Sequence, residues 1–430
     1  MKNKEEKKGM RYIYGILVLV LVGCGGSGEN VKKATDIDLS DTHVYQQDSK
    51  YSKVLKRCAT AHIRSASCAL ATLPLLSQIQ SIPTKEQIMQ RVLVSHDWMG
   101  ERFSQMLDIL GDDIKELLGA VTAIVIDDDV RPSHYWTMTG AIYLDPRYLW
   151  LTPSEAHDIT VKDDYRKNYG SELKFDAFWR YVKDNQYAYH FSALDSNTTR
   201  ATDDIKYPLA RLLYHELAHA NDFAPREVIA SFNQSTPIVT LLNTNSIKNK
   251  YPSTQLYKTY PLESNTLKSI GKVLYHGTTS NNEEKGLSSK DIGLLFAEDG
   301  ASAMYGYSTQ YEDMAMMFEM TMMKYHYNIE ADIGFVTNPS EDHNITYKDY
   351  IVGWGIRNRI ADPLVSERAL FIAKKILPNE TNWDNYFASE IGESKMLKEG
   401  LNWFDNLNLG VEKRQIENRK IDSHNFERFE

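Results

Sequence analysis

The sequence predicts an α+β fold with helical regions at both ends of the chain. Residues 85–121 carry apolar side chains three and four positions apart, as amphipathic helices do. The runs Val121–Ile126 and Gly140–Leu144 are short, apolar and stopped by aspartates, which is typical of strands. With 430 residues, 42% hydrophobic and 25% charged, the chain has room for two or three domains and a sizeable core.

The N-terminus predicts a secretory signal. Several lysines precede the apolar run Ile13–Val22, which is about half the ~20 residues that cross a bilayer as a helix. The letters LVGC at 21–24 resemble the lipobox of bacterial lipoproteins, in which the chain is cut before the cysteine and the cysteine is diacylated. We therefore expect residues 1–23 to be a lipoprotein signal peptide and Cys24 to carry lipid; the alternative is an ordinary signal peptide with a chance cysteine.

A lipid on Cys24 would place the protein in the bacterial cell envelope. The polar, glycine-rich residues 24–48 then read as a flexible tether between membrane and body. Gly25 follows the cysteine where an aspartate would favour the inner membrane, so the outer membrane is expected. The other partner class considered, nucleic acid, is not expected, because 49 basic and 58 acidic residues give a net charge of -9 and no basic run stands out.

The two remaining cysteines, Cys58 and Cys68, are expected to form a structural disulfide in an oxidising compartment. Ten residues of unbroken helix would separate their Cα atoms by about 15 Å. A disulfide tolerates roughly 7 Å at most. A turn must therefore fall between them, and Ser65–Ser67 is the expected place.

The rest of the chain divides by pattern into three regions. Residues 49–120 are expected to be a helical N-terminal region, and 121–330 the central domain. Within it, 225–300 is rich in Ser, Thr, Asn and Lys and is expected to form loops and short elements, with one small apolar piece at Lys272–Tyr275. Residues 331–430 are expected to be a helical C-terminal region.

Two features of the sequence could suggest a calcium or a copper site, but each has a simpler interpretation. The three aspartates Asp127–Asp129 lack the glycine and the later glutamate of an EF-hand loop, so a solvated turn is favoured over a calcium site. A cluster of methionines offers soft ligands for copper, but its helical spacing favours core packing. Its members are Met314, Met316, Met317, Met320, Met322 and Met323.

The stretch LLYHELAHANDF, residues 212–223, predicts a metal-binding helix. Asp203 or Asp204 can cap it, Pro208 is tolerated in its first turn, and it should end before Pro225. Two histidines four residues apart lie one above the other on a helix, so both imidazoles can reach one ion. These are His215 and His219.

Glu216 lies between the two histidines, where it can act as a base. Zinc in a catalytic site takes three protein ligands and leaves the fourth position to a water of lowered pKa. Glu216 can take the proton of that water and deliver it to a leaving amine. The bland alternative is a pair of partly buried histidines satisfied by hydrogen bonds.

A third ligand must come from elsewhere in the chain. The metzincin pattern needs a histidine six residues after His219, where Pro225 stands instead. Glu312, within a stretch of good helix formers that follows Gln310, is the preferred ligand. The rivals are Glu227, Glu263 and His276, the last in a possible strand.

The motif HELAHAND resembles the HExxHAxD helix of gluzincin metallopeptidases related to anthrax lethal factor. Tyr305, followed seven residues later by Glu312 and Asp313, resembles their second motif. The resemblance implies a zincin-like fold with Zn²⁺ as the cofactor. The roles it implies are zinc ligation by His215, His219 and Glu312, base catalysis by Glu216, oxyanion stabilisation by Tyr305, and a supporting position for Asp222.

The chain departs from this family pattern in two ways. The glutamate usual four residues after the third ligand is Met316, so support for a ligating histidine must come from Glu319 or Asp222. Glu312 follows His219 by 93 residues, a gap that requires an insertion. Tyr307 and Tyr311 are close enough in sequence to take the place of Tyr305.

The sequence as a whole predicts a lipid-anchored zinc metallopeptidase that hydrolyses peptide bonds. The run Gly140–Leu144 is a candidate edge strand on which zincins lay an extended peptide substrate, with a plain buried strand as the alternative. The alternative function is a non-catalytic zinc-binding lipoprotein of the envelope. A structural zinc needs a fourth protein ligand, for which His276 and His326 are the candidates.

Overall fold

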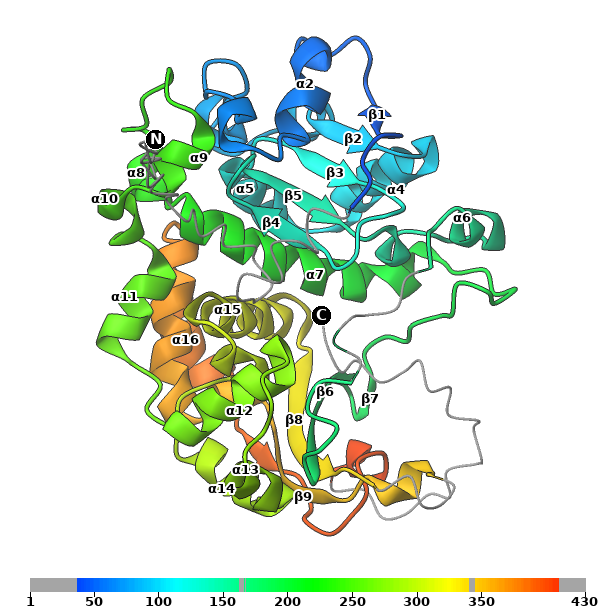
Figure 1. Ribbon diagram of the computed structural model, residues 1–430, viewed down its shortest axis with the longest axis vertical. Helices are drawn as coiled ribbons and strands as arrows, with labels where there is room; N and C mark the ends of the chain where they lie inside the picture. The colour runs from blue at the N-terminus through cyan, green and yellow to red at the C-terminus, as the bar shows by residue number, and fades with distance from the viewer. Residues whose placement is uncertain (1–36, 162–165, 167, 340–344, 410–430) are drawn as a thin grey trace, which may run out of the picture.

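The computed structural model describes residues 37–161, 166, 168–339 and 345–409. The expected signal peptide, Cys24 and most of the expected tether lie outside these residues. The described chain is a mixed α+β protein with two five-stranded sheets. The first sheet lies in the upper part of the view in Figure 1 and the second in the lower part.

The first sheet has the order β1-β2-β3-β5-β4. Strands β2, β3 and β5 pair in parallel, while β1 and β4 pair antiparallel at the two edges. The short apolar runs predicted as strands do form β3 and β5. The bounds are β1 His43–Val44, β2 Val92–Val94, β3 Ile124–Ile126, β4 His134–Trp136 and β5 Ala141–Leu144.

Strand pairing joins segments that the sequence assigns to three different regions. β1 belongs to the expected tether 24–48, and β2 belongs to the expected helical region 49–120, yet both join the sheet that contains β3. Val92–Val94 is a buried strand only three residues long, and the helical spacing on either side of it conceals it. The helices of this part are α2 Ser52–Ala59, α3 Lys85–Met89, α4 Asp97–Ile109, α5 Asp112–Leu117 and, after β5, α6 Pro153–His157.

Cys58 and Cys68 form a disulfide with a Cα–Cα distance of 5.4 Å. The chain turns between them, because α2 ends at Ala59 and a single 3-10 turn follows at Arg64–Ala66. This is the region where the spacing of the cysteines requires a turn. Both cysteines are buried in a cluster with residues of β3 and β5.

The second sheet is antiparallel throughout, with the order β10-β9-β8-β6-β7. It corrects the expectation that 331–430 is a separate helical region, since β8 crosses residue 331 and pairs with β6 from the central domain. The expected helical character of this region is present in α16 and α17. The bounds are β6 Phe175–Lys183, β7 Gln186–Tyr187, β8 Glu330–Thr337, β9 Val352–Arg357, β10 Lys395–Met396, α16 Pro363–Ile376 and α17 Trp383–Asn385.

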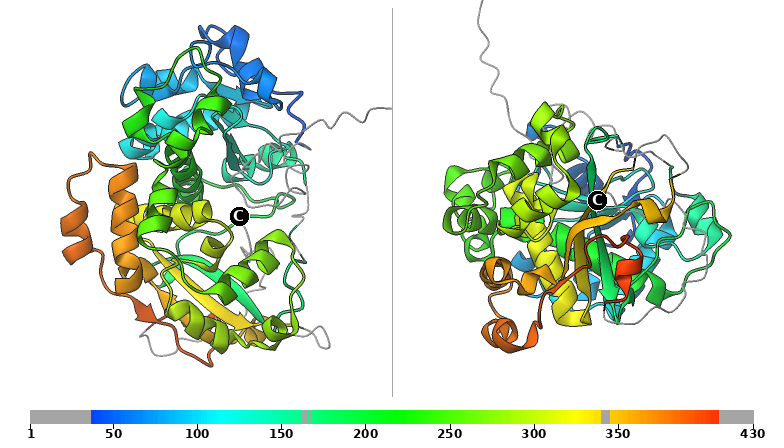
Figure 2. Two further views of the ribbon diagram at one scale, coloured as in Figure 1. Left: turned by 60° about the vertical axis from the view of Figure 1, so that its left-hand side comes forward. Right: turned by 90° about the horizontal axis from the view of Figure 1, so that it is seen from below.

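Two long helices, α7 (Thr202–Phe223) and α15 (Gln310–Tyr327), lie against each other between the sheets (Figure 1). α7 packs on the first sheet, where the ring of Phe223 stacks on Tyr135 of β4. α15 packs on β8 and on α16, and Figure 2 shows α15 and α16 side by side.

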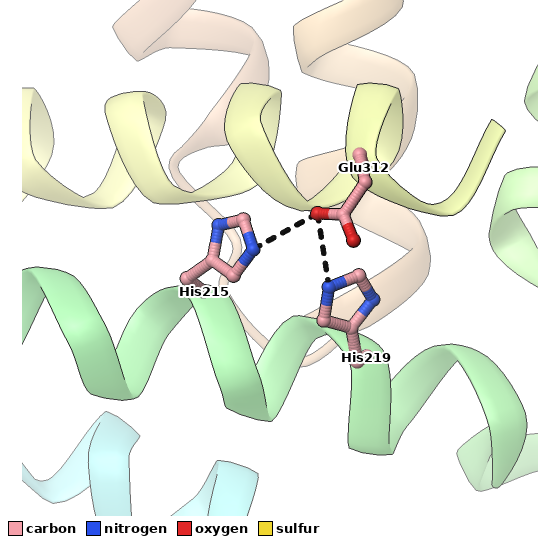
Figure 3. A group of neighbouring side chains, drawn as sticks. All are labelled: His215, His219 and Glu312. Atoms are coloured by element: carbon pink, nitrogen blue, oxygen red, sulfur yellow. Dashed lines mark hydrogen bonds and ion pairs between the residues drawn. The ribbon is translucent and has the colours of Figure 1, made fainter. Parts of the chain in front are cut away.

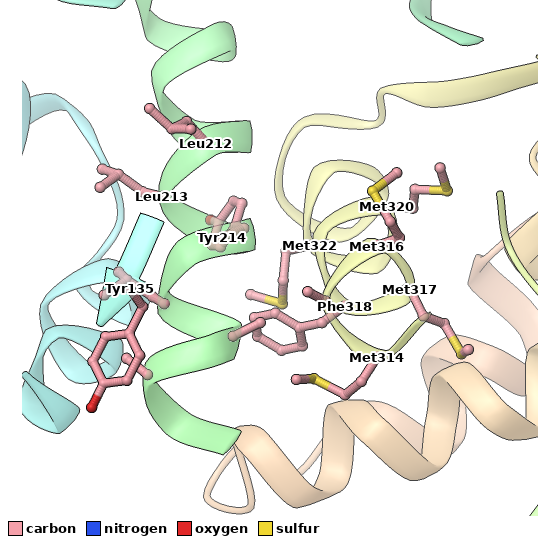
Figure 4. Packing of buried hydrophobic residues seen from close by; sticks show 14 of the residues in the cluster. Tyr135, Leu212, Leu213, Tyr214, Met314, Met316, Met317, Phe318, Met320 and Met322 are labelled. Atoms are coloured by element: carbon pink, nitrogen blue, oxygen red, sulfur yellow. The ribbon is translucent and has the colours of Figure 1, made fainter. Parts of the chain in front are cut away.

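The methionine cluster of α15 is core, as its spacing predicts. Its six side chains are at most 3% exposed. Figure 4 shows Met322 and Phe318 directed toward α7, where Phe318 meets Tyr214 edge to face at 6.4 Å. These thioethers therefore fill the space between helices.

Residues 225–300 form short elements, as expected, but these elements are helices and they cover most of the stretch, so loops make up less of it than the sequence suggests. Residues that are typical of turns cap the longest of these helices, α12: the Ser264 side chain accepts from the N–H of Leu267 at its start, and Gly277 ends it with a left-handed φ of 68°. His276 is therefore at the end of a helix and not in a strand. The helices are α8 Arg226–Ile229, α9 Ile238–Leu242, α10 Asn245–Lys248, α11 Pro252–Thr259, α12 Asn265–His276, α13 Asn282–Gly286 and α14 Ser289–Ala297.

None of the helices in the described residues is both long enough and apolar enough to span a bilayer.

The turn at Asp127–Asp129 is only partly solvated. Asp127 is 1% exposed, and its Oδ1 accepts from the backbone N–H of Asp129 at 2.9 Å. Burial raises the pKa of Asp127 from 3.8 to about 7. The folded chain therefore retains a proton at pH values where the unfolded chain has lost it.

Replacing Asp127 by asparagine should raise the free energy of unfolding at pH 8 but not at pH 4. Between about pH 4 and pH 7 the unfolded carboxyl of the wild type ionises while the folded one stays protonated, so stability falls as pH rises. Each pKa unit corresponds to about 1.4 kcal/mol, so the gain is at most about 4 kcal/mol. Urea unfolding at both pH values measures it, and an equal gain at pH 4 and pH 8 would contradict the assignment.

Candidate metal centre

Three buried side chains from α7 and α15 converge on one point. The donor atoms of His215, His219 and Glu312 all lie within 4.8 Å of one another. Glu312 Oε2 is 3.1 Å from His215 Nε2 and 3.3 Å from His219 Nε2 (Figure 3). Two imidazoles and a carboxylate are borderline ligands that suit a divalent transition metal. This group can hold a metal ion.

The helix α7 places the two histidines, but it begins earlier than the sequence predicts. It starts at Thr202, and the carboxylate of Asp204 accepts from the N–H of Ala201, so Asp204 is inside the first turn. Pro208 consequently lies within the helix and not in its first turn. The helix ends at Phe223, before Pro225, as predicted.

The first turn of α15 places Glu312, the expected third ligand. Thr309 caps the helix, because its side-chain oxygen accepts from the N–H of Glu312 at 3.1 Å. Glu312 is then the third residue of the helix and is 1% exposed. A long separation in sequence is therefore bridged by the packing of α15 on α7.

The charges of the group are strongly coupled. Burial alone raises the pKa of Glu312, but His219 and His215 outweigh it and hold that pKa well below its usual range. Burial lowers the pKa of His215, while Glu312 and Glu319 outweigh it and raise that pKa to about 10.

Glu216 lies beside this group with different properties. It is 2% exposed, and its Oε2 has no hydrogen-bond partner among the described residues. Burial raises its pKa to about 7, against the opposing effect of His215 and His219. A carboxylate with a pKa near neutrality can both accept and release a proton.

Glu319 supports the first histidine. Its Oε2 is 2.9 Å from His215 Nδ1, so the imidazole can donate to it while Nε2 stays directed at the metal group. Glu319 is seven residues after Glu312, two helical turns along the same face of α15. Met316, which stands where the family pattern has a glutamate, is buried.

Asp222, the other suggested support, is directed elsewhere. Its Oδ1 accepts from the backbone N–H of Ser253, and its Oδ2 accepts from the Ser253 hydroxyl, both at 2.7 Å. No hydrogen bond joins it to either histidine within the described residues, and His219 Nδ1 has no hydrogen-bond partner there. The Asp222 carboxylate therefore binds Ser253, at the start of α11, and not a histidine, which is the partner that the sequence suggests.

Tyr305 lies against the metal group. It belongs to the 3-10 turn Met304–Tyr307, and its ring is stacked on that of His215 at a centroid distance of 6.5 Å. The two sequence alternatives pack elsewhere: Tyr307 against Phe296, and Tyr311 against Phe223. Of the three tyrosines, Tyr305 is the one whose ring contacts a histidine of the group.

Glu263 is exposed, and the other candidate ligands have partners outside the group. His276 Nε2 donates to the Ser308 carbonyl at 3.1 Å, and His326 Nε2 is 3.3 Å from Asp113. Glu227 pairs with Lys250. In the described part of the chain, His215, His219 and Glu312 make the one group of three or more such residues that can share an ion.

Two side chains that contact Glu319 are not predicted from the sequence. The hydroxyl of Tyr181, on β6, donates to Glu319 Oε1 at 2.6 Å, and Arg211 Nη1 lies 3.6 Å from the same oxygen. Arg211 precedes His215 by one helical turn, which could have signalled it. Nothing in the sequence around Tyr181 points to this contact.

The edge of the first sheet is also different from expectation. β5, the candidate edge strand, pairs with β3 on one side and β4 on the other. The edge strand on this side of the sheet is β4, which packs on α7.

No protein-family model, curated protein or solved structure matches this chain.

Proposed function

We propose that this protein is a zinc-dependent metallopeptidase of zincin-like fold. The observation that carries the proposal is the convergence of His215, His219 and Glu312 with Glu216 beside them. Two imidazoles and one carboxylate are a donor set that catalytic zinc uses, with one position left for water. The two residues suspected as a fourth protein ligand, His276 and His326, are bonded elsewhere.

Each residue of the site has a proposed task. Zinc, when bound by the three side chains, supplies Lewis acidity and lowers the pKa of a water. With the metal held there, Glu216 would take a proton from the attacking water and give it to the leaving amine. The Tyr305 hydroxyl donates to the oxygen that becomes negative as the peptide carbonyl is attacked.

The proposed surroundings follow from the sequence and the sheet. Lipid on Cys24 would anchor the enzyme in the bacterial envelope, at the outer membrane. An extended peptide substrate would pair with β4, the edge strand that packs on α7, because main-chain hydrogen bonds at a sheet edge hold such segments.

Metal analysis of a soluble form that lacks residues 1–24 tests the proposal. We expect about one zinc per chain, lost in His219→Ala and kept in His276→Ala, which changes a nearby histidine outside the group. X-ray absorption should show two imidazoles and oxygen ligands. A wild-type protein without zinc would refute the proposal, and loss of zinc in His276→Ala would favour the structural, non-catalytic site.

A further inference from the structure

Arg368 of α16 joins three segments near the metal centre. It is 3% exposed and forms a bidentate pair with Asp313, with Nη2–Oδ2 at 2.6 Å and Nη1–Oδ1 at 3.2 Å. Its Nη1 also donates to the Gly300 carbonyl at 2.6 Å, and its Nε donates to the Tyr260 carbonyl at 3.1 Å. Such a planar fork fixes its partners in both distance and orientation.

The partners of Arg368 are next to two residues of the candidate site. Asp313 follows the ligand Glu312 in the first turn of α15, and Gly300 lies shortly before Tyr305. The two segments also press on each other, because a Cβ added at Gly306 would meet Asp313 Oδ1 at 3.2 Å and its Cα at 3.3 Å. A shift of Asp313 would therefore move Glu312 and disturb the turn that carries Tyr305.

A second arginine secures the same loop. Arg359 Nε donates to the Ala301 carbonyl at 2.8 Å, and its Nη2 donates to the Asp299 carbonyl at 2.7 Å. Arg359 does not reach α15 through any of its hydrogen bonds to described residues. Arg368 is thus the arginine that connects this loop to the helix of the third ligand.

We propose that Arg368 is a positioning residue of the metal centre, which holds Glu312 against the histidines of α7 by fixing Asp313. A carboxylate ligand must stand about 2 Å from the ion, so small displacements of the α15 turn weaken binding. This role rests on one part of the proposed function, the binding of a metal by the three side chains. It does not require that the protein hydrolyses peptides.

Metal affinity in Arg368→Met and Arg368→Lys tests this role. We expect Arg368→Met to weaken zinc binding about 10–100-fold, as loss of outer supporting contacts does. Lysine keeps the charge but cannot form the fork, so Arg368→Lys should fall between wild type and Arg368→Met. Competition with a chromophoric chelator gives the affinity, and the visible spectrum of the cobalt-loaded protein reports the ligand geometry.

Arg180→Met is the matched control. Arg180 is also buried and pairs with an aspartate, Asp332, but it lies in the second sheet and donates to the Trp403 carbonyl. The Arg180→Met change should lower the melting temperature, as Arg368→Met does, but should leave the zinc affinity and the cobalt spectrum unchanged.

Three outcomes are decisive. Weaker zinc binding in the Arg368 variants alone supports the role. Wild-type affinity and spectrum in a folded Arg368→Met or Arg368→Lys protein, or equal weakening by Arg180→Met, overturns it while the proposed function stands. A wild-type protein that binds no zinc overturns both.

Discussion

Glu216→Gln is expected to retain zinc and to lose peptide hydrolysis, with kcat/KM lower by about 10²–10⁴-fold. Glutamine has the same shape but cannot take a proton from water. Glu216 is not one of the three converging donors, and its Oε2 has no hydrogen-bond partner among the described residues, so the exchange leaves the metal group intact. Cleavage of a mixture of quenched fluorogenic peptides, with metal content measured on the same samples, gives both values.

Glu227→Gln is the control for this change. Glu227 lies just past the end of α7, where its side chain is about half exposed and pairs with Lys250, and its loss should leave cleavage unchanged. Loss of zinc from Glu216→Gln would argue that Glu216 is a ligand. Full activity in Glu216→Gln would remove the proposed base from the mechanism.

Glu319→Ala is expected to be the most destabilising single change at the site. Glu319 is fully buried and contacts His215, Tyr181 and Arg211. Removing one member of a buried charge network costs about 3–5 kcal/mol. Zinc affinity should also fall about 10–100-fold, because His215 loses the partner that orients its ring. Urea unfolding of the metal-free protein and chelator competition measure the two effects separately.

Asp222→Asn separates the two supports suggested by the sequence. Because Asp222 bonds to Ser253 and not to a histidine, this change should leave zinc affinity near that of wild type. Glu319→Gln, which keeps the volume, should be milder than Glu319→Ala. If Asp222→Asn weakened zinc binding more than Glu319→Ala, the assignment of Glu319 as the support would be wrong.

The local part of the candidate site was readable from the sequence. His215 and His219 are brought together by helical spacing alone, which needs no knowledge of the fold. Glu312 is far along the chain, and only its resemblance to a second motif selected it. Tyr181 and Arg368 come from a strand and a helix whose packing no local pattern encodes.

The fold was readable where elements were long and patterned, and was misread where they were short. β2 has three residues between helices, and β8 begins where the sequence suggested a new region. Most helices of 225–300 have nine residues or fewer, and the polar residues that cap α12, α13 and α14 give this stretch a composition that resembles that of loops. The regional boundaries failed because both ends of the chain contribute strands to sheets shared with the centre.

The two donor helices belong to opposite halves of the molecule, since α7 rests on the first sheet and α15 on the second. An ion held by His215, His219 and Glu312 would link these two halves. Because the ion would bind only the folded protein, part of its binding free energy would add to the free energy of unfolding. Removing the metal with a chelator would then weaken the contact between α7 and α15 and lower the free energy of unfolding of the whole protein.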